Sequence, residues 1–326
     1  MATPVFFMHD GAIDELICIP FLQSMPNISL SGIWITPSDC LGFPTATVCS
    51  QMLQFINSST TALFLSDSSS QRPFPWIYRQ YALMVNLLPL LNVAGSSEIK
   101  APHMISGRSN RNSFADKSIF NVIKKENDKQ GEATVFLVTS PLTDFVLLLE
   151  AIPELKSEIA SIVWMGGSIS AGGNIDTGIA IGANPNAEWN AYWDPFAVDT
   201  VLRSGIEINI FPLDVTNKFI LTPDVLRQYF IPGAVSSQML DLAAQMYALV
   251  AFQNGFSFWD TAAAAFLGNP GLFTMTQENI NIHIDESDPN TFGCITVGGG
   301  YPVNIASTNQ VTQFYQYLTV QLAGIK

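Results

Sequence analysis

The sequence predicts an α/β fold: an open, mostly parallel, Rossmann-like sheet with helices on both faces. Short apolar runs alternate with segments of helical periodicity along the chain, which is typical of parallel strands joined by crossover helices. The first run, residues 5–8, is apolar at every position, as expected for a strand that is buried on both faces. The 326 residues show no repeat and no linker, so we expect a single domain over residues 1–326.

The N-terminal half contains three expected strands. The run at residues 5–8 leads into a helix that begins near residue 16, and residues 28–36 form the next apolar run. A helix at residues 45–57 then precedes a third strand at residues 62–65. This order of strand and helix is that of successive βαβ units.

Two segments lack a regular apolar pattern. Residues 71–92 are rich in proline and aromatic residues, and we expect a long loop with helical turns. Residues 108–130 carry most of the local charge, and we expect a solvated excursion on the surface.

The C-terminal half continues the alternation. We expect strands at residues 134–138, 162–165 and 207–211, and helices at 194–203, 239–252 and 308–323. Residues 172–186 are small and polar and are expected to form a loop, and the glycines at 298–300 a turn.

Composition excludes several classes of function. Only 13% of residues are charged, against about 25% in typical domains, which favours self-association, and we expect a homodimer. The net charge of −13 argues against a nucleic-acid partner, because phosphate binding needs lysine and arginine. No apolar stretch reaches the ~18 residues of a membrane helix, and the N-terminus has no signal-peptide pattern. The four cysteines lack CxxC spacing, so we expect free thiols and a cytoplasmic location.

Three carboxylates follow the first strand: Asp10, Asp14 and Glu15. In open α/β sheets, ligands bind at the carboxyl ends of the strands. Carboxylates this close repel one another unless a cation neutralises them, and all-oxygen ligands suit Ca²⁺ or Mg²⁺. The alternative is a polar turn in which Asp14 and Glu15 occupy the first turn of a helix, where its dipole favours them.

Several common catalytic motifs are missing from the sequence. It contains no GxxxxGK[ST], no GxGxxG after a strand, no HExxH and no GxSxG. The histidines His9, His103 and His283 are far apart and give no metal-binding spacing. A serine–histidine mechanism is therefore not expected.

The acidic stretch HDGAIDE at residues 9–15 resembles the N-terminal Asp-rich motif of the nucleoside hydrolases. Further segments are similar to motifs of the same family in the same order. They are TSPLT at 139–143, MGG at 165–167, Asn174, AEWNAYWDP at 187–195 and WD at 259–260. The turn at residues 39–40, the loop at 73–75 and Trp259 look most like the purine-preferring (inosine-adenosine-guanosine) branch.

The resemblance implies hydrolysis of the N-glycosidic bond of a nucleoside, giving ribose and free base, and a role in purine salvage. It implies Asp10 as general base for a metal-bound water. The implied Ca²⁺ ligands are Asp10, Glu15, the main-chain carbonyl of Thr139, and Asp260. The implied ribose pocket consists of Asp14, Asn174, Glu188 and Asn190, with Met165 beneath the sugar.

The base is expected to stack on Trp259 and on Trp76 or Tyr78, and to donate a hydrogen bond to Asp39. Trp189 is grouped with these substrate residues, with packing as its alternative. Asp39 could instead be a turn residue. Asp260 could be a helix N-cap, a metal ligand or both.

Three positions depart from the family pattern. Glu15 replaces the usual aspartate, Met8 stands where an aspartate is common, and Ala12 replaces an asparagine or glycine. These departures motivate an alternative function, a relative that binds nucleosides without hydrolysing them. A metal-dependent phosphatase is disfavoured, because no lysine or arginine accompanies the carboxylates.

Overall fold

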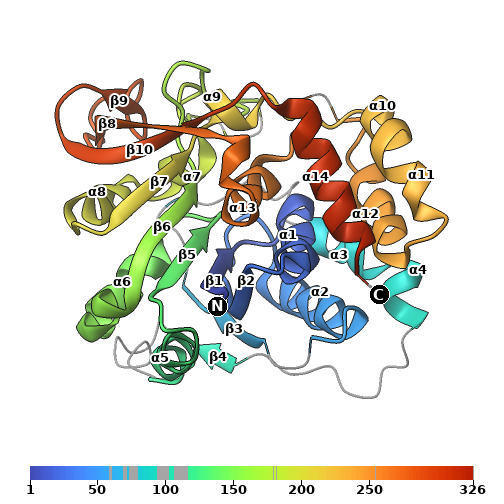
Figure 1. The fold of residues 1–326 in the computed structure, drawn as a ribbon. Helices are drawn as coiled ribbons and strands as arrows, with labels where there is room; N and C mark the ends of the chain where they lie inside the picture. Colours follow the sequence, from blue (N-terminus) through green and yellow to red (C-terminus); the bar gives the residue numbers. More distant parts are fainter. Residues whose placement is uncertain are drawn as a thin grey trace.

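The computed structural model describes residues 1–58, 61–68, 72, 80–93, 103–105, 117–178, 180, 182–253 and 255–325. Its strands are β1 (Thr3–His9), β2 (Ile28–Ile35), β3 (Ala62–Ser66), β4 (His103–Ile105), β5 (Thr134–Val138), β6 (Ile159–Met165), β7 (Glu207–Phe211), β8 (Thr274–Ile282), β9 (Ile295–Val297) and β10 (Tyr301–Ser307). Within the described residues they form one ten-stranded sheet in the order β4-β3-β2-β1-β5-β6-β7-β10-β8-β9 (Figure 1).

Helices connect these strands and cover both faces of the sheet (Figure 1). The α-helices are α1 (Ile13–Ser24), α2 (Gly42–Phe55), α3 (Tyr81–Asn86), α4 (Pro89–Val93), α5 (Ser118–Gln130), α6 (Thr143–Ala151), α7 (Trp189–Trp193), α8 (Pro195–Arg203), α9 (Leu213–Thr216), α10 (Pro223–Val225), α11 (Ile231–Ala234), α12 (Gln238–Ala248), α13 (Trp259–Gly268) and α14 (Val311–Ala323). Shorter helical segments are η3 (Pro153–Glu158), η4 (Leu226–Phe230) and η5 (Pro270–Leu272).

The sheet is parallel from β4 through β7 and on to β10, and only the β10–β8 and β8–β9 pairs are antiparallel. The predicted fold class is therefore confirmed. The three strands after residue 270 were not predicted. Most side chains of β8 are exposed, so this edge of the sheet leaves no continuous apolar run in the sequence.

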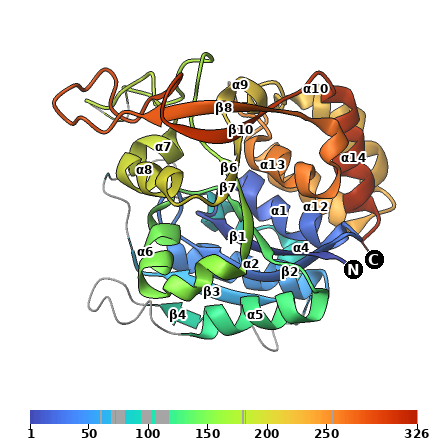
Figure 2. The same cartoon turned by 60° about the vertical axis from the view of Figure 1, so that its left-hand side comes forward.

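The central strand β1 shows how the layers are built. Val5 and Phe7 point into one apolar cluster, which includes residues of α1, α2, α12, α13 and α14. Phe6 and Met8 point to the opposite face and pack with residues of α5, α6 and α8. Because neighbouring side chains of a strand face opposite ways, one apolar run supplies both cores. Figure 2 shows the two helical layers on either side of the sheet.

The prediction for residues 108–130 was wrong for the part that the structure describes. Residues 118–130 form helix α5, in which Ile119, Ile123 and Asn127 are buried. The charges of this segment lie on the solvent face of an amphipathic helix. Because the segment has few apolar residues, its two buried isoleucines did not produce a recognisable helical pattern in the sequence.

Two other predictions concern membrane-spanning helices and the state of the cysteines. In the described part of the chain, no helix combines the length and the apolar character needed to cross a membrane. All four cysteines are free thiols, as expected.

A buried carboxylate ties the ends of β2 and β3 to α6. Asp144, in the first turn of α6, is fully buried. It accepts hydrogen bonds from Trp34 Nε1 at 2.8 Å, Thr36 Oγ1 at 2.7 Å and Ser66 Oγ at 3.2 Å, and another from Ser68 Oγ. Burial raises the pKa of Asp144, and these donors oppose that shift by stabilising its charged form.

Replacing Asp144 with alanine should strongly destabilise the fold. The substitution leaves the Trp34 indole N–H and three hydroxyl groups without their acceptor in the interior, which should cost at least ~3 kcal/mol. Urea unfolding measures this loss. The matched control is Asp128→Ala on the exposed face of α5, where the carboxylate pairs with Lys124 and the change should stay within about 0.5 kcal/mol. A loss below ~1 kcal/mol for Asp144→Ala would contradict the role.

Candidate active site

A cavity of about 400 Å³ lies at the carboxyl ends of β1, β2, β5 and β6. Every predicted site residue that the structure describes lines it, namely Asp10, Asp14, Glu15, Asp39, Thr139, Met165, Asn174, Glu188, Trp189, Asn190, Trp259 and Asp260. Trp76 and Tyr78 lie outside the described residues. Residues from across the chain thus meet where a parallel sheet binds its ligands.

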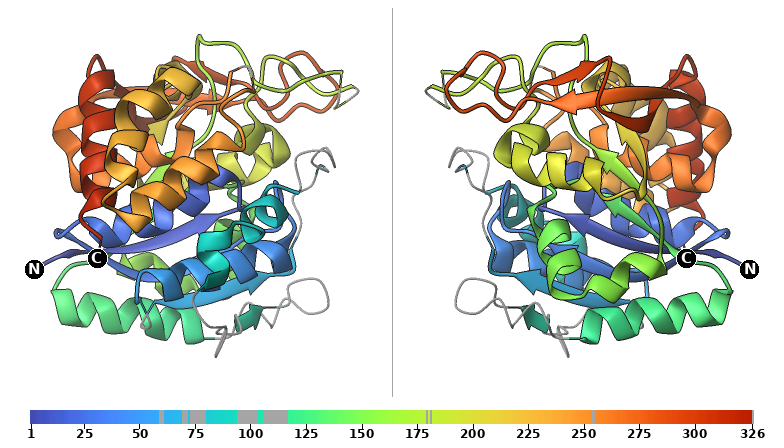
Figure 3. Two further views of the ribbon diagram at one scale, coloured as in Figure 1. Left: turned by 90° about the vertical axis from the view of Figure 1, so that its right-hand side faces the viewer. Right: turned by 90° about the vertical axis from the view of Figure 1, so that its left-hand side faces the viewer.

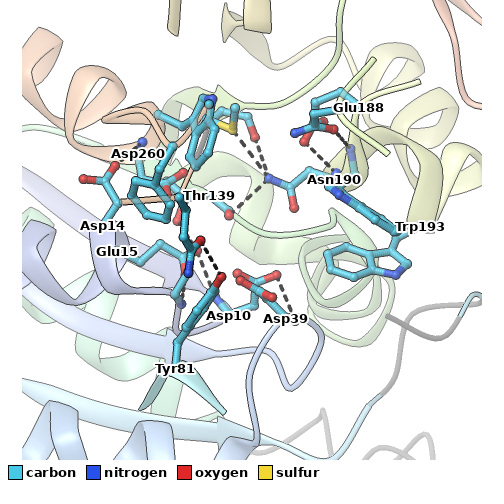
Figure 4. Close-up of a pocket in the computed structure, with 18 residues that line it drawn as sticks. Asp10, Asp14, Glu15, Asp39, Tyr81, Thr139, Glu188, Asn190, Trp193 and Asp260 are labelled. Atoms are coloured by element: carbon cyan, nitrogen blue, oxygen red, sulfur yellow. Dashed lines mark hydrogen bonds between the residues drawn. The ribbon is translucent and has the colours of Figure 1, made fainter. Parts of the chain in front are cut away.

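The cavity wall is strongly acidic. Six carboxylates come from five separate segments: Asp10, Asp14, Glu15, Asp39, Glu188 and Asp260 (Figure 4). Among the described lining residues there is no lysine, arginine or histidine to balance them. So many negative charges in one cavity require protons or a bound cation.

The tightest group of carboxylates fits Ca²⁺. One oxygen each of Asp10, Glu15 and Asp39 lies within 4.8 Å of the others. Ca²⁺ binds oxygens at ~2.3–2.6 Å, so two of its ligands can be up to about 5 Å apart. Asp39, which we expected to contact the base, is part of this group. Asp260 lines the same cavity but does not belong to this group of three carboxylates.

Asp10 is held by the turn that follows β2. Its Oδ2 accepts hydrogen bonds from Ser38 Oγ at 2.7 Å and from the Asp39 backbone N–H at 3.3 Å. The carboxylate therefore has a fixed orientation at the end of the central strand, where β1 pairs with both β2 and β5.

Glu15 uses its longer side chain to connect three segments. Its Oε1 accepts from Thr139 Oγ1 at 2.9 Å and from the Asp10 backbone N–H at 3.2 Å. Its Oε2 accepts from the Ala12 backbone N–H at the start of α1. With its added methylene, the Glu15 carboxylate accepts a hydrogen bond at the N-terminus of α1 and still lies within the acidic group.

Burial raises the pKa of Asp10, Glu15 and Asp260. For Glu15 the nearby charges of Asp10 and Asp260 raise the pKa further, and for Asp260 the charges of Asp14 and Asp10 do so. A divalent cation at this point would reverse these shifts, because it favours the charged form of each carboxylate.

Asp14 caps helix α13, which begins next to the cavity. Its Oδ2 accepts from the backbone N–H groups of Asp260 at 2.7 Å and Thr261 at 2.9 Å. Its Oδ1 accepts from Tyr247 Oη at 2.5 Å and Thr261 Oγ1 at 2.9 Å. Burial raises the pKa of Asp14 to about 6. The N-cap position itself is Phe258, so the expectation that Asp260 could be the N-cap was wrong.

Glu188 likewise accepts hydrogen bonds from backbone N–H groups at the start of a helix, in this case α7. Its Oε1 accepts from the Asn190 backbone N–H at 2.9 Å. Its Oε2 accepts from the backbone N–H groups of Gly167 at 2.7 Å and Ala191 at 3.1 Å. Burial raises the pKa of Glu188 to about 7.

Two amides near Glu188 have defined orientations. Asn190 Nδ2 donates to the carbonyls of Thr139 at 3.2 Å and Met165 at 3.1 Å, so Oδ1 is the atom that Asn190 can offer to a ligand. Asn174 Oδ1 accepts from the Trp189 backbone N–H at 3.1 Å, so this amide can offer its Nδ2. An acceptor and a donor side by side suit the hydroxyls of a sugar.

The loop that carries Asn174 rests on the connection between β8 and β9. Asn184 Nδ2 donates to the Phe292 carbonyl at 2.9 Å. At the other end of the loop, the Asp214 carboxylate accepts from the backbone N–H groups of Ile169 and Ser170, both at 2.8 Å. Figure 3 shows the two long segments side by side, at the end of the molecule opposite both termini. These contacts give the loop a defined shape.

Trp259 lies at the start of α13 and is half-buried. Its Nε1 donates to Asn217 Oδ1 at 2.9 Å, and its ring centroid is 4.8 Å from that of Phe256. The indole is therefore held from two sides at the cavity wall.

Residues 5–316 match the family model of inosine-uridine preferring nucleoside hydrolases. The chain belongs to the nucleoside hydrolase family. The non-specific ribonucleoside hydrolase RihC of Escherichia coli is 29% identical over 84% of this chain and 82% of its own length.

Solved structures agree with this assignment. The crystal structure of the inosine-uridine preferring nucleoside hydrolase of Bacillus anthracis superimposes with a TM-score of 0.85 at 28% identity, over 99% of this chain and 100% of the other. A purine-preferring ribonucleoside hydrolase from Gardnerella vaginalis has the same fold, with a TM-score of 0.72 at 19% identity over 99% of both chains. This nucleoside hydrolase is therefore a ribonucleoside N-ribohydrolase.

Six residues that line the cavity of the nucleoside hydrolase were not predicted as site residues. They are Ala12, Tyr81, Trp193, Gln253, Gly255 and Phe256. Trp193 lies inside the matched segment 187–195 and could have been included from its position. Tyr81 and Gln253 lie in segments without a recognised motif, and only the folded chain brings them to the cavity.

The stability of the metal-free nucleoside hydrolase should fall as pH rises from about 6.5 to about 8. Glu188, with its pKa raised from 4.5 to about 7, holds a proton at the start of this range that the unfolded chain lacks. Stability is therefore lost as the native group ionises. His9, with its pKa lowered to about 3 from 6.5 by burial, favours the native state as pH rises until the histidine of the unfolded chain is neutral, at about pH 7.5. It therefore offsets part of the Glu188 effect in the lower half of the range.

Thermal denaturation in EDTA and in millimolar Ca²⁺ measures this dependence. We expect Tm to drop by about 1 °C across the range in EDTA, because the lost stability is below about 1 kcal/mol and the chain is long. With Ca²⁺ the drop should disappear and Tm at pH 8 should rise, because a bound ligand stabilises the native state. A Tm that does not respond to Ca²⁺ at pH 8 would contradict a cation site.

Proposed function

We propose that this nucleoside hydrolase prefers purine ribonucleosides and uses Ca²⁺, with Asp10 as the general base. The observation that carries the proposal is the acidic cavity, in which clustered carboxylates adjoin a set of sugar-type donors and acceptors. The cation would be held by Asp10, Glu15, the Thr139 carbonyl and Asp260. When bound, Ca²⁺ would supply positive charge that acidifies the attacking water.

Asp10 would take a proton from that water. Its Oδ2 is held by Ser38 and by the Asp39 backbone, and we assign the proton of the water to Oδ1. The carboxylate keeps its orientation while the proton moves, because the residues after β2 hold it. Glu15, anchored to Thr139 and to the start of α1, would steady the other side of the cluster.

The ribose would bind between Glu188, Asn190 and Asn174, with Asp14 on the side of α13 and Met165 beneath the ring. The side-chain orientations support this, since Asn174 offers a donor and Asn190 an acceptor. Positive charge develops on the sugar as the N-glycosidic bond breaks, and the surrounding carboxylates would stabilise it.

The purine preference rests on the aromatic residues at the cavity. Trp259, positioned by Asn217 and Phe256, would stack on the base and favour its protonated form. Trp189, together with Trp76 or Tyr78, would add further contacts to the base. Asp39 would accept a hydrogen bond from the base. The relatives themselves are named non-specific, inosine-uridine preferring or purine-preferring.

The alternative of a relative that only binds nucleosides rests on Met8, Ala12 and Glu15. Met8 is fully buried and belongs to the apolar cluster under α5 and α6. Glu15 keeps its carboxylate within the acidic group. Both observations favour hydrolysis over binding alone.

We also propose a homodimer, a cytoplasmic location and a role in purine salvage. The low charge content supports self-association, and the free thiols suit a reducing compartment.

Asp10→Asn should lower kcat for inosine by at least ~10²-fold, because an amide cannot take a proton from water. Release of base and reducing sugar measures the loss. Calorimetric titration with Ca²⁺ shows whether the variant still binds the cation, which separates a lost base from a lost metal. Near-normal turnover would place the base elsewhere.

Trp259→Ala should lower kcat/KM for inosine by about thirtyfold, the equivalent of roughly 2 kcal/mol of stacking on a cationic base. p-Nitrophenyl riboside, whose leaving group needs no such help, should be affected little. Trp259→Phe is the matched control and should retain part of the activity on inosine. Equal losses on both substrates would make Trp259 a structural residue of α13.

A further inference from the structure

Two residues outside every matched motif meet at the cavity. Tyr81, the first residue of α3, donates its hydroxyl to Gln253 Oε1 at 3.0 Å. Gln253 lies in the connection between α12 and α13, 172 residues away in sequence. Both line the cavity, Tyr81 being buried and Gln253 exposed. This hydrogen bond joins two parts of the cavity wall that lie far apart in the sequence.

Tyr81 lies on the side of the cavity that carries Asp39, across from Glu188 and Asn190 (Figure 4). Helix α3 packs on α2, and a hydrogen bond from the Ala82 backbone to the Cys40 thiol joins the first turn of α3 to the residue after Asp39. Figure 4 shows Tyr81 and Asp39 on one side of the cavity, with Glu188 and Asn190 on the other. Because the ribose is assigned to Glu188 and Asn190, we assign the base to the side of Tyr81 and Asp39.

The hydrogen bond decides which end of the Gln253 amide faces a ligand. Because Oε1 accepts the Tyr81 proton, the amide presents Nε2, which is a donor only. Nucleobases carry ring nitrogens and carbonyl oxygens as acceptors. These acceptors gain negative charge as the base departs, so a donor placed there binds the transition state more strongly than the substrate.

We propose that Gln253, oriented by Tyr81, donates a hydrogen bond to an acceptor atom of the leaving base. The inference rests on the proposed function and adds to it the residue that recognises the base. In the step, the water oxygen bonds to C1′ and a water proton passes to Asp10. A second ring nitrogen of the base takes a proton from solvent, and the glycosidic nitrogen leaves with the bonding electron pair, so that the base departs as a neutral molecule. Gln253 transfers no proton and acts only through its hydrogen bond.

Gln253→Met keeps the length of the side chain and removes the donor. We expect kcat/KM for inosine to fall about tenfold, as for one lost hydrogen bond. p-Nitrophenyl riboside, a good leaving group, should change by less than about twofold. Gln238→Met, at an exposed position at the start of α12, is the control and should change neither substrate.

Tyr81→Phe tests the orientation of the amide. The variant lets the amide rotate, so it should lose part of the rate on inosine and keep the rate on p-nitrophenyl riboside. If Tyr81 acts through Gln253, the double variant should be no worse than Gln253→Met alone. Additive losses, or a matching loss on p-nitrophenyl riboside, would give Tyr81 a structural role and overturn its part in the inference.

The inference and the proposed function fail in different ways. If the wild type cleaves inosine and Gln253→Met cleaves it equally well, the inference is wrong and the function stands. If the wild type cleaves neither substrate, the function is wrong, and calorimetry decides the inference. Gln253→Met should then weaken inosine binding about tenfold and leave ribose binding unchanged, and equal inosine binding by both proteins would overturn it.

Discussion

Mutual repulsion of buried carboxylates is the constraint on which this site depends. The cavity is lined by six carboxylates, of which all but Asp39 are buried, with no cationic side chain among its described lining residues. Three are compensated in the same way, by the N-terminus of a helix. Glu15 accepts from the start of α1, Asp14 from the start of α13, and Glu188 from the start of α7. Backbone N–H groups and helix dipoles there favour negative charge. The helices thus make an acidic cavity possible, and Ca²⁺ would supply the remaining charge.

The same hydrogen bonds set the geometry of the site. Asp14 lies in the first helix of the chain and holds the start of α13, and with it Asp260. Asn190 holds the Thr139 carbonyl from a third segment. Behind this layer, Asp144 joins the ends of β2 and β3 to α6. Residues of the site therefore fix one another's positions, with Asp144 supporting them from behind, as precise positioning requires.

The proposed base side of the cavity is built differently from the proposed sugar side. Glu188 and Asn190 belong to a matched motif, and their contacts run to the backbone of the central strands. Tyr81 and Gln253 lie outside the matched motifs and contact each other through their side chains, and Trp259 is held by the side chain of Asn217. Relatives with the same fold are named for different base preferences. A shared sheet with variable connections explains how one fold can serve several bases.

The sequence by itself determined the fold class and most of the cavity wall. Apolar runs such as residues 5–8 predicted the parallel sheet because strands buried on both faces leave a continuous local signal. The order of the motifs then predicted which residues would gather at its edge. The exposed strand β8 and the amphipathic helix α5 left no such signal, since few of their residues are buried.

Contacts between distant segments were decided only by the tertiary structure. The sequence could not show that Asp14 caps α13, or that Asp39 approaches Asp10 and Glu15. It also could not show that Tyr81 meets Gln253. The sequence around each of these residues does not indicate which distant residue it contacts. The packing of helices on the sheet alone brings them within hydrogen-bonding distance.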